Sequence, residues 1–310
     1  MDSDEEIIEP EEEEEEIIKP KKQSKIVISS NKKKSVIVIS NSKKKIPASE
    51  TEIIEDKIQT NSNNKIEDKI QISFIIPVLP VIPPHLNIYE IASRFIPLGW
   101  ENEFEFRKKE LKAISDLVLK SEENFQIAPP NKDIFRAFYH TPKQNVRVII
   151  VGQDPYPTDG VANGLSFSVS DGCNVPRSLA NIYKEINNCY PNFKIPSTGN
   201  LEPWAKQGVF LINTCLTVPV GNANGHGKFN LWLPFISHVL ESVTKSNKDI
   251  FVLLWGKNAL SVTPYIKSRK DRILTASHPS PFSADKGFFG CGHFKTVNDN
   301  ITEPKINWQL

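Results

Sequence analysis

Four short apolar runs, and the amphipathic stretches between them, set the pattern of the second half of the chain. The runs cover residues 146–151, 209–212, 250–254 and 272–276. Largely apolar runs of this length are typical of strands that are buried on both faces. Because helical spacing separates the runs, the pattern predicts an α/β domain in which helices cover both faces of a parallel sheet.

The helices are predicted from apolar residues that recur every three or four positions. One helix should run from Asn102 to Lys120, a short one over 133–138, and another from Trp232 to Val243. A further helix should begin with Ser178 as its N-cap residue, because Leu179, Ile182, Tyr183 and Ile186 follow at helical spacing.

The first seventy residues have a different composition. Residues 1–70 carry 13 Lys and 17 acidic residues, and short duplicated strings recur among them. Such a segment buries too little apolar surface to offset the entropy of ordering, so it is predicted to be a disordered, low-complexity tail. Two alternatives are that its Ile/Val tetrads add as strands to a partner's sheet edge, or that its Lys runs direct nuclear import or DNA tethering. Residues 71–94 are predicted to be a Pro-rich linker, and 95–310 the folded domain.

Charge and cysteine content narrow the class of protein. Residues 71–310 carry 25 basic and 20 acidic residues, a mild excess that permits nucleic-acid binding. The four cysteines form no CxxC pair, so neither a metal site nor a disulfide framework is predicted. We expect no signal peptide, no membrane-spanning segment and no mitochondrial leader, and therefore a protein that is neither secreted nor membrane-bound.

Polar residues follow each apolar run. Asp154, Asn213, Gly256 and His278 stand at or just beyond the ends of the four predicted strands. The carboxyl ends of parallel strands share one edge of a sheet, which is where open α/β sheets bind ligands. The sequence therefore predicts a site that combines a carboxylate, an amide and an imidazole at this edge.

Seven strings between Trp100 and Trp308 resemble the uracil-DNA glycosylase family, in the same order along the chain. They are PPNKDIFRAF, VIIVGQDPYP, GLSFSV, SLANIYKEI, WAKQGVFLIN, LLWGKNA and HPSPFSADKGFFGCGHF. The resemblance implies that 95–310 is a single catalytic domain with a short, mostly parallel, twisted sheet flanked by helices on both faces.

The resemblance also implies the catalytic residues. Asp154 would orient the attacking water and stabilise the positive charge that develops on the sugar as the N-glycosidic bond breaks. His278 would donate a hydrogen bond to uracil O2 as negative charge develops on the departing base. A neutral imidazole suffices for this, because a preorganised donor needs no proton transfer.

Four residues would recognise the base. The Asn213 amide matches the donor and acceptor of uracil N3 and O4 and rejects the opposite pattern of cytosine. Tyr156 would stand where thymine carries its methyl group and exclude it by bulk. Phe167 would stack on the flipped base. Gln153 would supply backbone contacts to uracil O2.

DNA contacts are expected from three stiff turns. Phe282 takes the place of the family's usual leucine as the wedge that fills the vacated stack. Phosphate contacts are expected from Ser178, Arg177, Gly256, Lys257, Ser280 and Ser283. Pro157 replaces the family's usual histidine, and we expect the added charges of Arg177 and Lys257 to compensate for it.

Six of these residues also have a plain structural alternative. Asp154 could cap its turn, Asn213 could close a strand end, and His278 could be satisfied by the backbone of a tight turn. Phe167 could be a core residue on a strand, Phe282 could fold back onto the core, and Ser178 could serve only as an N-cap.

Together, these observations predict a monofunctional uracil-DNA glycosylase of base-excision repair, without metal or organic cofactor. Its partner would be uracil-containing DNA, single- or double-stranded, with replication or repair proteins reached through the tail. A monomer is expected, located in the nucleus or at a site of viral DNA replication. Two alternatives remain: a DNA-bound processivity or scaffold factor for a replication polymerase, and a glycosylase for a wider set of damaged bases.

Overall fold

The computed structural model describes residues 30–31, 34–35 and 77–310, and the chain divides into two units, Met1–Lys69 and Ile70–Leu310. In the first unit, β1 (Ser30–Asn31) and β2 (Lys34–Ser35) pair antiparallel. The predicted disordered tail lies almost entirely outside the described residues. The second unit carries the rest of the fold.

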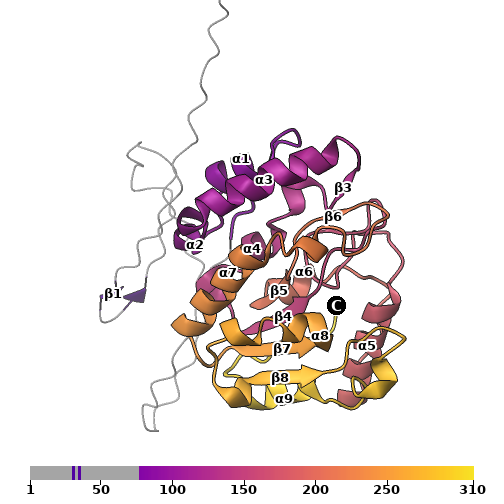
Figure 1. Ribbon diagram of the computed structural model, residues 1–310. Coiled ribbons are helices and arrows are strands. Elements are labelled where there is room, and N and C mark those ends of the chain that lie inside the picture. Colours follow the sequence, from indigo (N-terminus) through magenta and orange to yellow (C-terminus); the bar gives the residue numbers. More distant parts are fainter. Residues whose placement is uncertain (1–29, 32–33, 36–76) are drawn as a thin grey trace, which may run out of the picture. The chain divides into compact units, whose positions relative to one another are not determined.

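A four-stranded sheet forms the centre of the second unit (Figure 1). Its strands are β4 (Val148–Gly152), β5 (Val209–Asn213), β7 (Phe251–Trp255) and β8 (Ile273–Ala276). They are all parallel and follow the spatial order β5-β4-β7-β8. Every residue of β4, β5 and β7 is buried, which confirms the prediction of a parallel sheet covered on both faces.

Nine helices surround the sheet in the part of the chain that the structure describes. They are α1 (Ile88–Arg94), α2 (Glu101–Phe106), α3 (Lys108–Glu122), α4 (Arg136–His140), α5 (Arg177–Cys189), α6 (Glu202–Ala205), α7 (Leu233–Ser246), α8 (Gly256–Leu260) and α9 (His293–Asn300). A small antiparallel pair, β3 (Ile127–Ala128) with β6 (Val218–Pro219), lies outside the main sheet.

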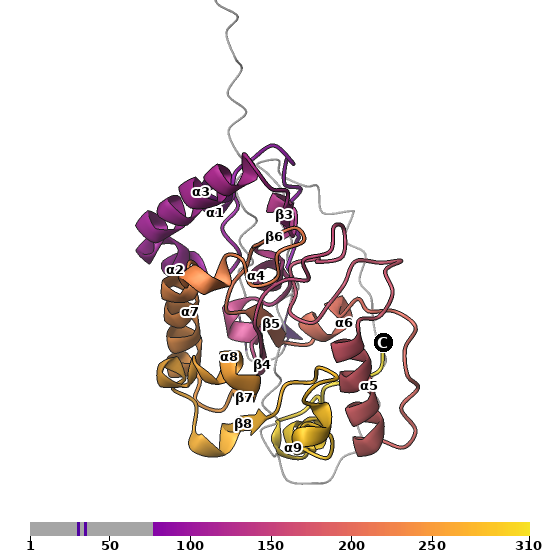
Figure 2. The same cartoon turned by 45° about the vertical axis from the view of Figure 1, so that its right-hand side comes forward.

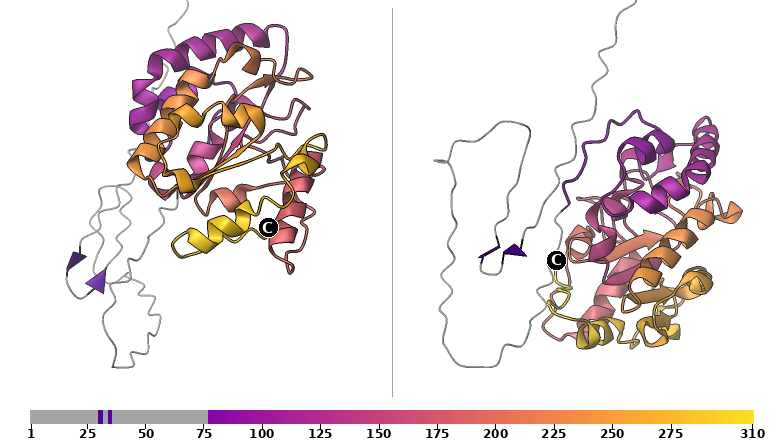
Figure 3. Two further views of the ribbon diagram at one scale, coloured as in Figure 1. Left: turned by 60° about the horizontal axis from the view of Figure 1, so that its bottom comes forward. Right: turned by 90° about the vertical axis from the view of Figure 1, so that its left-hand side faces the viewer.

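Aromatic side chains pack these helices against the strands in two groups. In the first, Phe138 of α4 contacts Phe210 of β5 edge-to-face with ring centroids 5.2 Å apart, and Phe104 and Phe235 join them from α2 and α7. In the second, Trp255 of β7 contacts Phe294 of α9. Figure 2 shows α7 and α5 on opposite sides of the strands, so the predicted two-sided cover of the sheet is confirmed. Figure 3 shows the same ribbon in two further views.

Several predicted boundaries differ from the structure, among them the short helix predicted over 133–138, which is α4 (Arg136–His140). The helix predicted over Asn102–Lys120 is two helices that meet at Arg107, whose backbone is not helical. The helix predicted to begin at Ser178 has Pro176 as its N-cap, so the N-cap reading of Ser178 is wrong. Proline fixes its own φ and gives a stiff entry to the helix.

The predicted linker over 71–94 overlaps the folded unit at its C-terminal end. Helix α1 lies in this range, and its Ile88 and Ile91 are buried in the main core. The helix begins with a capping box, in which Asn87 Oδ1 accepts from Glu90 N and Glu90 Oε2 accepts from Asn87 N. The residues of this capping box can be read in the sequence, but the helix that follows them is too short to show a clear apolar periodicity.

Candidate active site

The residues that follow β4 and end β5 meet because the two strands are neighbours. Gly152 of β4 is paired in register with Asn213 of β5. A Cβ atom on Gly152 would collide with the Asn213 side chain, so the glycine allows the amide to lie against the end of β4. Asp154 follows two residues later, and the sheet therefore places a carboxylate and an amide side by side.

Asp154 is held by a main-chain hydrogen bond that the sequence did not reveal. The backbone N–H of Asn224, in the long connection after β6, donates to Asp154 Oδ2 at 2.6 Å. Burial raises the pKa of Asp154 above the usual value for an aspartate, whereas this N–H opposes the rise by stabilising the charged form. The site thus holds a partly desolvated carboxylate in one orientation.

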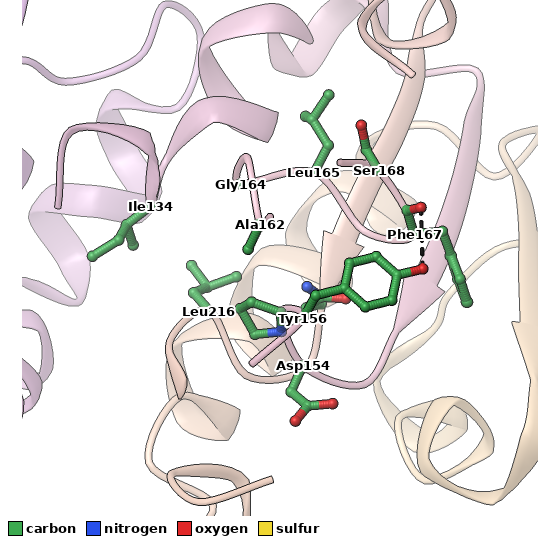
Figure 4. A pocket seen from close by; sticks show the side chains of 11 residues that line it. Ile134, Asp154, Tyr156, Ala162, Gly164, Leu165, Phe167, Ser168 and Leu216 are labelled. Atoms are coloured by element: carbon green, nitrogen blue, oxygen red, sulfur yellow. Dashed lines mark hydrogen bonds between the residues drawn. The ribbon is translucent and has the colours of Figure 1, made fainter. Parts of the chain in front are cut away.

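A pocket of about 300 Å³, part of it open to solvent, lies against this carboxylate (Figure 4). It brings together four predicted site residues, Asp154, Tyr156, Phe167 and Asn213. Gln153 and His278 are not among its lining residues. Apolar side chains close the rest of the wall: Ile134, Pro155, Ala162, Leu165 and Leu216.

Tyr156 and Phe167 are fixed relative to each other. The Tyr156 hydroxyl donates to the Phe167 carbonyl at 3.3 Å, as the dashed line in Figure 4 marks. Phe167 has φ 62°, a left-handed conformation that is strained for a residue with a side chain, and it lies outside every strand. Phe167 is therefore not on a strand, as the structural alternative had it, although its partly buried ring does pack against the core.

Asn163 builds the turn that imposes this conformation. Its amide is buried, donates to Ser168 Oγ and to the Val169 carbonyl at 2.9 Å each, and accepts from Leu165 N at 3.3 Å. The ring of Phe167 then lies 5.6 Å from that of Trp255 and 5.9 Å from that of His278, measured between centroids. The turn thus sets an aromatic face at the pocket and links it to the imidazole.

The Asn213 side chain is buried at the pocket wall. It makes no hydrogen bond to another residue that the structure describes. Although the residue as a whole is buried, its amide atoms are not among the fully buried atoms that lack a partner, so they keep access to the pocket. An unpaired amide on a pocket wall is therefore ready for a flat polar ligand that offers one acceptor and one donor.

His278 is held in one tautomer. The backbone N–H of Ser280 donates to His278 Nδ1 at 3.0 Å, so the ring proton of the neutral imidazole lies on Nε2. Burial lowers the pKa of His278, which favours this neutral form. The imidazole can therefore donate one hydrogen bond through Nε2 without carrying charge.

Two neighbours fix the position of the His278 turn. Gly256 has φ +82° at the start of α8, and a Cβ atom there would lie 2.8 Å from His278 Cβ. Asn181 of α5 donates through Nδ2 to the Pro279 carbonyl at 2.8 Å. The turn is therefore packed against the end of β7 on one side and tied to α5 on the other.

The predicted DNA-contacting residues lie outside the pocket. Phe282 is 88% exposed, so the alternative that it folds back onto the core is wrong. Ser280 and Ser283 share a hydrogen bond at 2.9 Å between their hydroxyl oxygens, and Ser283 Oγ also donates to the His278 carbonyl. These hydroxyls stiffen the turn that presents Phe282.

The cations predicted to contact DNA come from two helix starts. Arg177 is the first residue of α5, and Lys257 follows Gly256 at the start of α8; both are exposed. Gln153 lies nearby, and its side-chain oxygen accepts from Asn258 Nδ2 of α8. Four asparagines, Asn163, Asn181, Asn224 and Asn258, thus support the site. Asn181 and Asn258 stand in the quoted strings SLANIYKEI and LLWGKNA, but sequence reasoning gave none of the four a role because none follows a predicted strand directly.

Two further findings bear on the class of protein. No group of three or more His, Cys, Asp and Glu residues suited to a metal ion exists among the residues with described positions, and all four cysteines are free. Within residues 77–310 and the short pair before them, no helix has the length and apolar character needed to span a bilayer.

The fold and the site define an α/β protein with a pocket at the C-terminal edge of its sheet, lined by a half-buried carboxylate, an amide and two aromatic rings. Comparison with known proteins identifies the particular group. The model of the family described as "Uracil DNA glycosylase superfamily" matches residues 138–302, which is more than half of the chain. The chain therefore belongs to the uracil-DNA glycosylase superfamily.

Individual relatives agree with this assignment. The uracil-DNA glycosylase of Proteus mirabilis (strain HI4320) is 43% identical over 220 residues, covering 69% of this chain and 97% of that protein. That of Fusobacterium nucleatum subsp. nucleatum is 42% identical over 211 residues, covering 67% and 92%. The crystal structure of mimivirus uracil-DNA glycosylase aligns with a TM-score of 0.65 and 26% identity, over 73% of this chain and 91% of that one.

Proposed function

We propose that this protein is a monofunctional uracil-DNA glycosylase, which binds uracil-containing DNA and hydrolyses the N-glycosidic bond to leave free uracil and an abasic site. The observation that carries the proposal is the presence, in one pocket, of the half-buried Asp154 carboxylate and the unpaired Asn213 amide. Within base-excision repair, this is the step that removes the base.

Asp154 supplies the hydrolytic part of the site. The bond breaks with positive charge building on the sugar, and a fixed carboxylate stabilises that charge and orients the water that attacks C1′. The Asn224 N–H holds one carboxylate oxygen, which leaves the second oxygen for the water. No lysine lines the pocket, which agrees with hydrolysis rather than lyase chemistry.

His278 supplies the electrostatic part. The departing base carries negative charge at O2, and the Nε2–H of a neutral imidazole can donate to that oxygen. The hydrogen bond from Ser280 N to Nδ1 supports this role, because it fixes the required tautomer before substrate arrives. Gln153 adds a backbone contact to the same oxygen.

Three residues select the base. Asn213 pairs with uracil N3–H and O4, Tyr156 blocks a methyl group at C5, and Phe167 stacks on the ring. The hydrogen bond between Tyr156 and Phe167 supports the assignment, since it keeps the blocking ring in place. These residues favour strict uracil selection over the alternative of a broad damaged-base glycosylase.

The remaining assignments concern DNA and partners. Phe282 is the wedge that enters the stack when uracil flips, and its exposure supports this role. Arg177, Ser178, Gly256, Lys257, Ser280 and Ser283 contact phosphates. The protein acts as a monomer in the nucleus or at a site of viral DNA replication, and replication or repair proteins bind the N-terminal tail. Nothing in the comparisons supports the alternative of a polymerase scaffold.

The test is uracil release from an oligonucleotide with one uracil, in EDTA, beside a matched oligonucleotide with thymine. We expect release from the first only. Asp154→Asn is the control variant, and it should bind the uracil strand while its turnover falls by about 10²- to 10⁴-fold. A folded wild-type protein that binds the strand but releases no uracil would overturn the proposal and favour the scaffold role.

A further inference from the structure

Two phenylalanines stand exposed at the C-terminal edge of the sheet. Phe282 is 88% exposed in the connection after β8, and Phe229 is 80% exposed in the connection between β6 and α7, which follows β5. The connection that carries Phe282 follows β8, at one end of the strand order, whereas the connection that carries Phe229 follows β6, which lies outside the main sheet. Phe282 has a role as the wedge, whereas Phe229 has none.

Phe229 belongs to the same connection that holds the catalytic carboxylate. Asn224 N donates to Asp154 Oδ2, and Asn224 O accepts from Lys228 N at 3.0 Å. The second hydrogen bond closes a helical turn that continues into the short 3₁₀ helix Gly227–Phe229. Phe229 ends this 3₁₀ helix and stands five residues after Asn224 in the chain.

The structure holds this connection rigidly on both sides of Phe229. His226 is buried, with Nδ1 2.9 Å from Thr217 Oγ1 and Nε2 3.2 Å from Ser121 Oγ. Trp232 is fully buried and donates through Nε1 to Thr217 Oγ1 at 2.8 Å. Between these anchors the ring of Phe229 points away from the core, so its exposure is set by the anchored backbone.

An exposed phenylalanine alone is ordinary on a protein surface. Its place one helical turn from the residue that holds Asp154 is the informative point. Lys228 beside it is exposed as well, and supplies a positive charge next to an aromatic face. An aromatic face with an adjacent cation is the combination by which proteins bind single nucleotides of an unpaired strand.

We propose that Phe229 stacks on the base of a nucleotide next to the uracil nucleotide, and so forms a flanking-nucleotide subsite separate from the uracil pocket and from the Phe282 wedge. This inference rests on the proposed function. Lys228 faces the phosphate of the same nucleotide. The ligand is a base that has left its stack, so the subsite favours single-stranded or locally opened DNA.

The test uses full-length protein and a set of single-stranded oligonucleotides that carry one uracil. In each member, one base within two positions of the uracil is replaced by an abasic tetrahydrofuran, which keeps every phosphate. We expect Phe229→Ala to lower kcat/KM on the intact strand by about 5- to 150-fold. On the strand that lacks the stacked base, wild type and Phe229→Ala should be equally active. Such non-additivity between the side-chain change and the missing base is expected only if the two groups contact each other.

Three variants separate stacking from other effects. Phe229→Leu keeps an apolar side chain without a π face and should lose most of the same activity, whereas Phe229→Trp should retain it. Phe106→Ala is the matched control. Phe106 is 70% exposed on α2. Glu103 of the same helix binds Lys143, which precedes β4 in the chain, so α2 lies near the edge of the sheet opposite to the site. The control variant should leave kcat/KM unchanged on every strand.

The outcomes distinguish this inference from the proposed function. If wild type excises uracil and Phe229→Ala lowers kcat/KM by the same factor on every strand, the effects of the substitution and of the missing base are additive. That result overturns the stacking proposal. Equal activity of Phe229→Ala and wild type on all strands overturns it as well. If wild-type protein excises no uracil from any strand, the proposed function itself has failed.

Discussion

At the scale of the residue, the site combines two groups whose pKa values move in opposite directions for the same reason. Burial raises the pKa of Asp154 and lowers that of His278, because each shift favours the uncharged form. For the imidazole the uncharged form is the useful one. For the carboxylate the charged form is needed, and the Asn224 N–H opposes the shift.

The pH dependence of turnover follows from these directions. Asp154 must be ionised, so activity should fall as the pH drops through its pKa, at a higher pH than for an exposed aspartate. Protonation of the His278 imidazole would also remove its neutral form, so removal of this side chain separates the two groups. We expect His278→Gln to reduce kcat without moving the midpoint of the acidic limb in a plot of kcat against pH. A midpoint that moves with this substitution would assign the limb to the histidine.

Tyr156 makes a second residue-scale prediction. Its ring is held across the pocket by the hydrogen bond to the Phe167 carbonyl. Tyr156→Ala should therefore admit the methyl group of thymine, and release of thymine from a thymine-containing oligonucleotide should become measurable. Tyr156→Phe keeps the ring and should release none. Thymine release by Tyr156→Phe would show that the ring is not the barrier.

At the scale of the element, the site depends on how each strand ends. β4 and β5 end at the Gly152–Asn213 pair, and β7 is followed directly by Gly256, which accepts a left-handed backbone beside His278. These ends position three functional side chains, and the helices and turns that follow fix them. A change at a strand end should therefore alter activity more than stability.

Gly256→Ala tests this expectation. The added Cβ atom would meet His278 Cβ at 2.8 Å, and the left-handed backbone adds about 1–2 kcal/mol of strain. We expect a loss of stability in thermal unfolding and a loss of kcat of about 100-fold, the scale expected when a catalytic group is displaced by 1 Å. The matched control is Gly172→Ala, at φ +80° with open space around the new atom. It should lose stability only, and an equal loss of kcat in both variants would contradict the argument.

At the scale of the whole molecule, charge is distributed unevenly along the chain. Residues 1–70 carry a net charge of −4 and residues 71–310 one of +5. Binding to DNA releases counterions in proportion to the phosphates that are neutralised, so the basic part sets the salt dependence of affinity. The exposed Arg177 and Lys257 stand at helix starts near the site.

Arg177→Ala and Lys257→Ala should each weaken DNA binding and reduce the slope of log Kd against log salt by about one. The measurement is affinity for a uracil-containing oligonucleotide over a range of salt concentrations. Lys112→Ala on α3 removes an equal charge, one paired with Asp116, and should leave the slope unchanged. An unchanged slope in the first two variants would remove these residues from the DNA path.

The sequence by itself determined the class of fold and most of the site. Buried parallel strands are apolar throughout, so their positions are visible in the pattern of residues, and the polar residues after them mark one edge of a sheet. The sequence could not show the break at Arg107, the proline entry to α5, or α1 inside the predicted linker. Those depend on local backbone geometry and on packing, which overrides a weak local pattern.

Only the tertiary structure decided the contacts that make the site specific. The strand order β5-β4-β7-β8, the Asn224 hydrogen bond to Asp154 and the left-handed Phe167 each join or constrain residues through packing of the whole unit. The tautomer of His278 likewise follows from the turn that carries it. Local sequence sets which side chains are present and which strand ends carry them. Their distances arise from contacts between segments far apart in the chain, which no local pattern encodes.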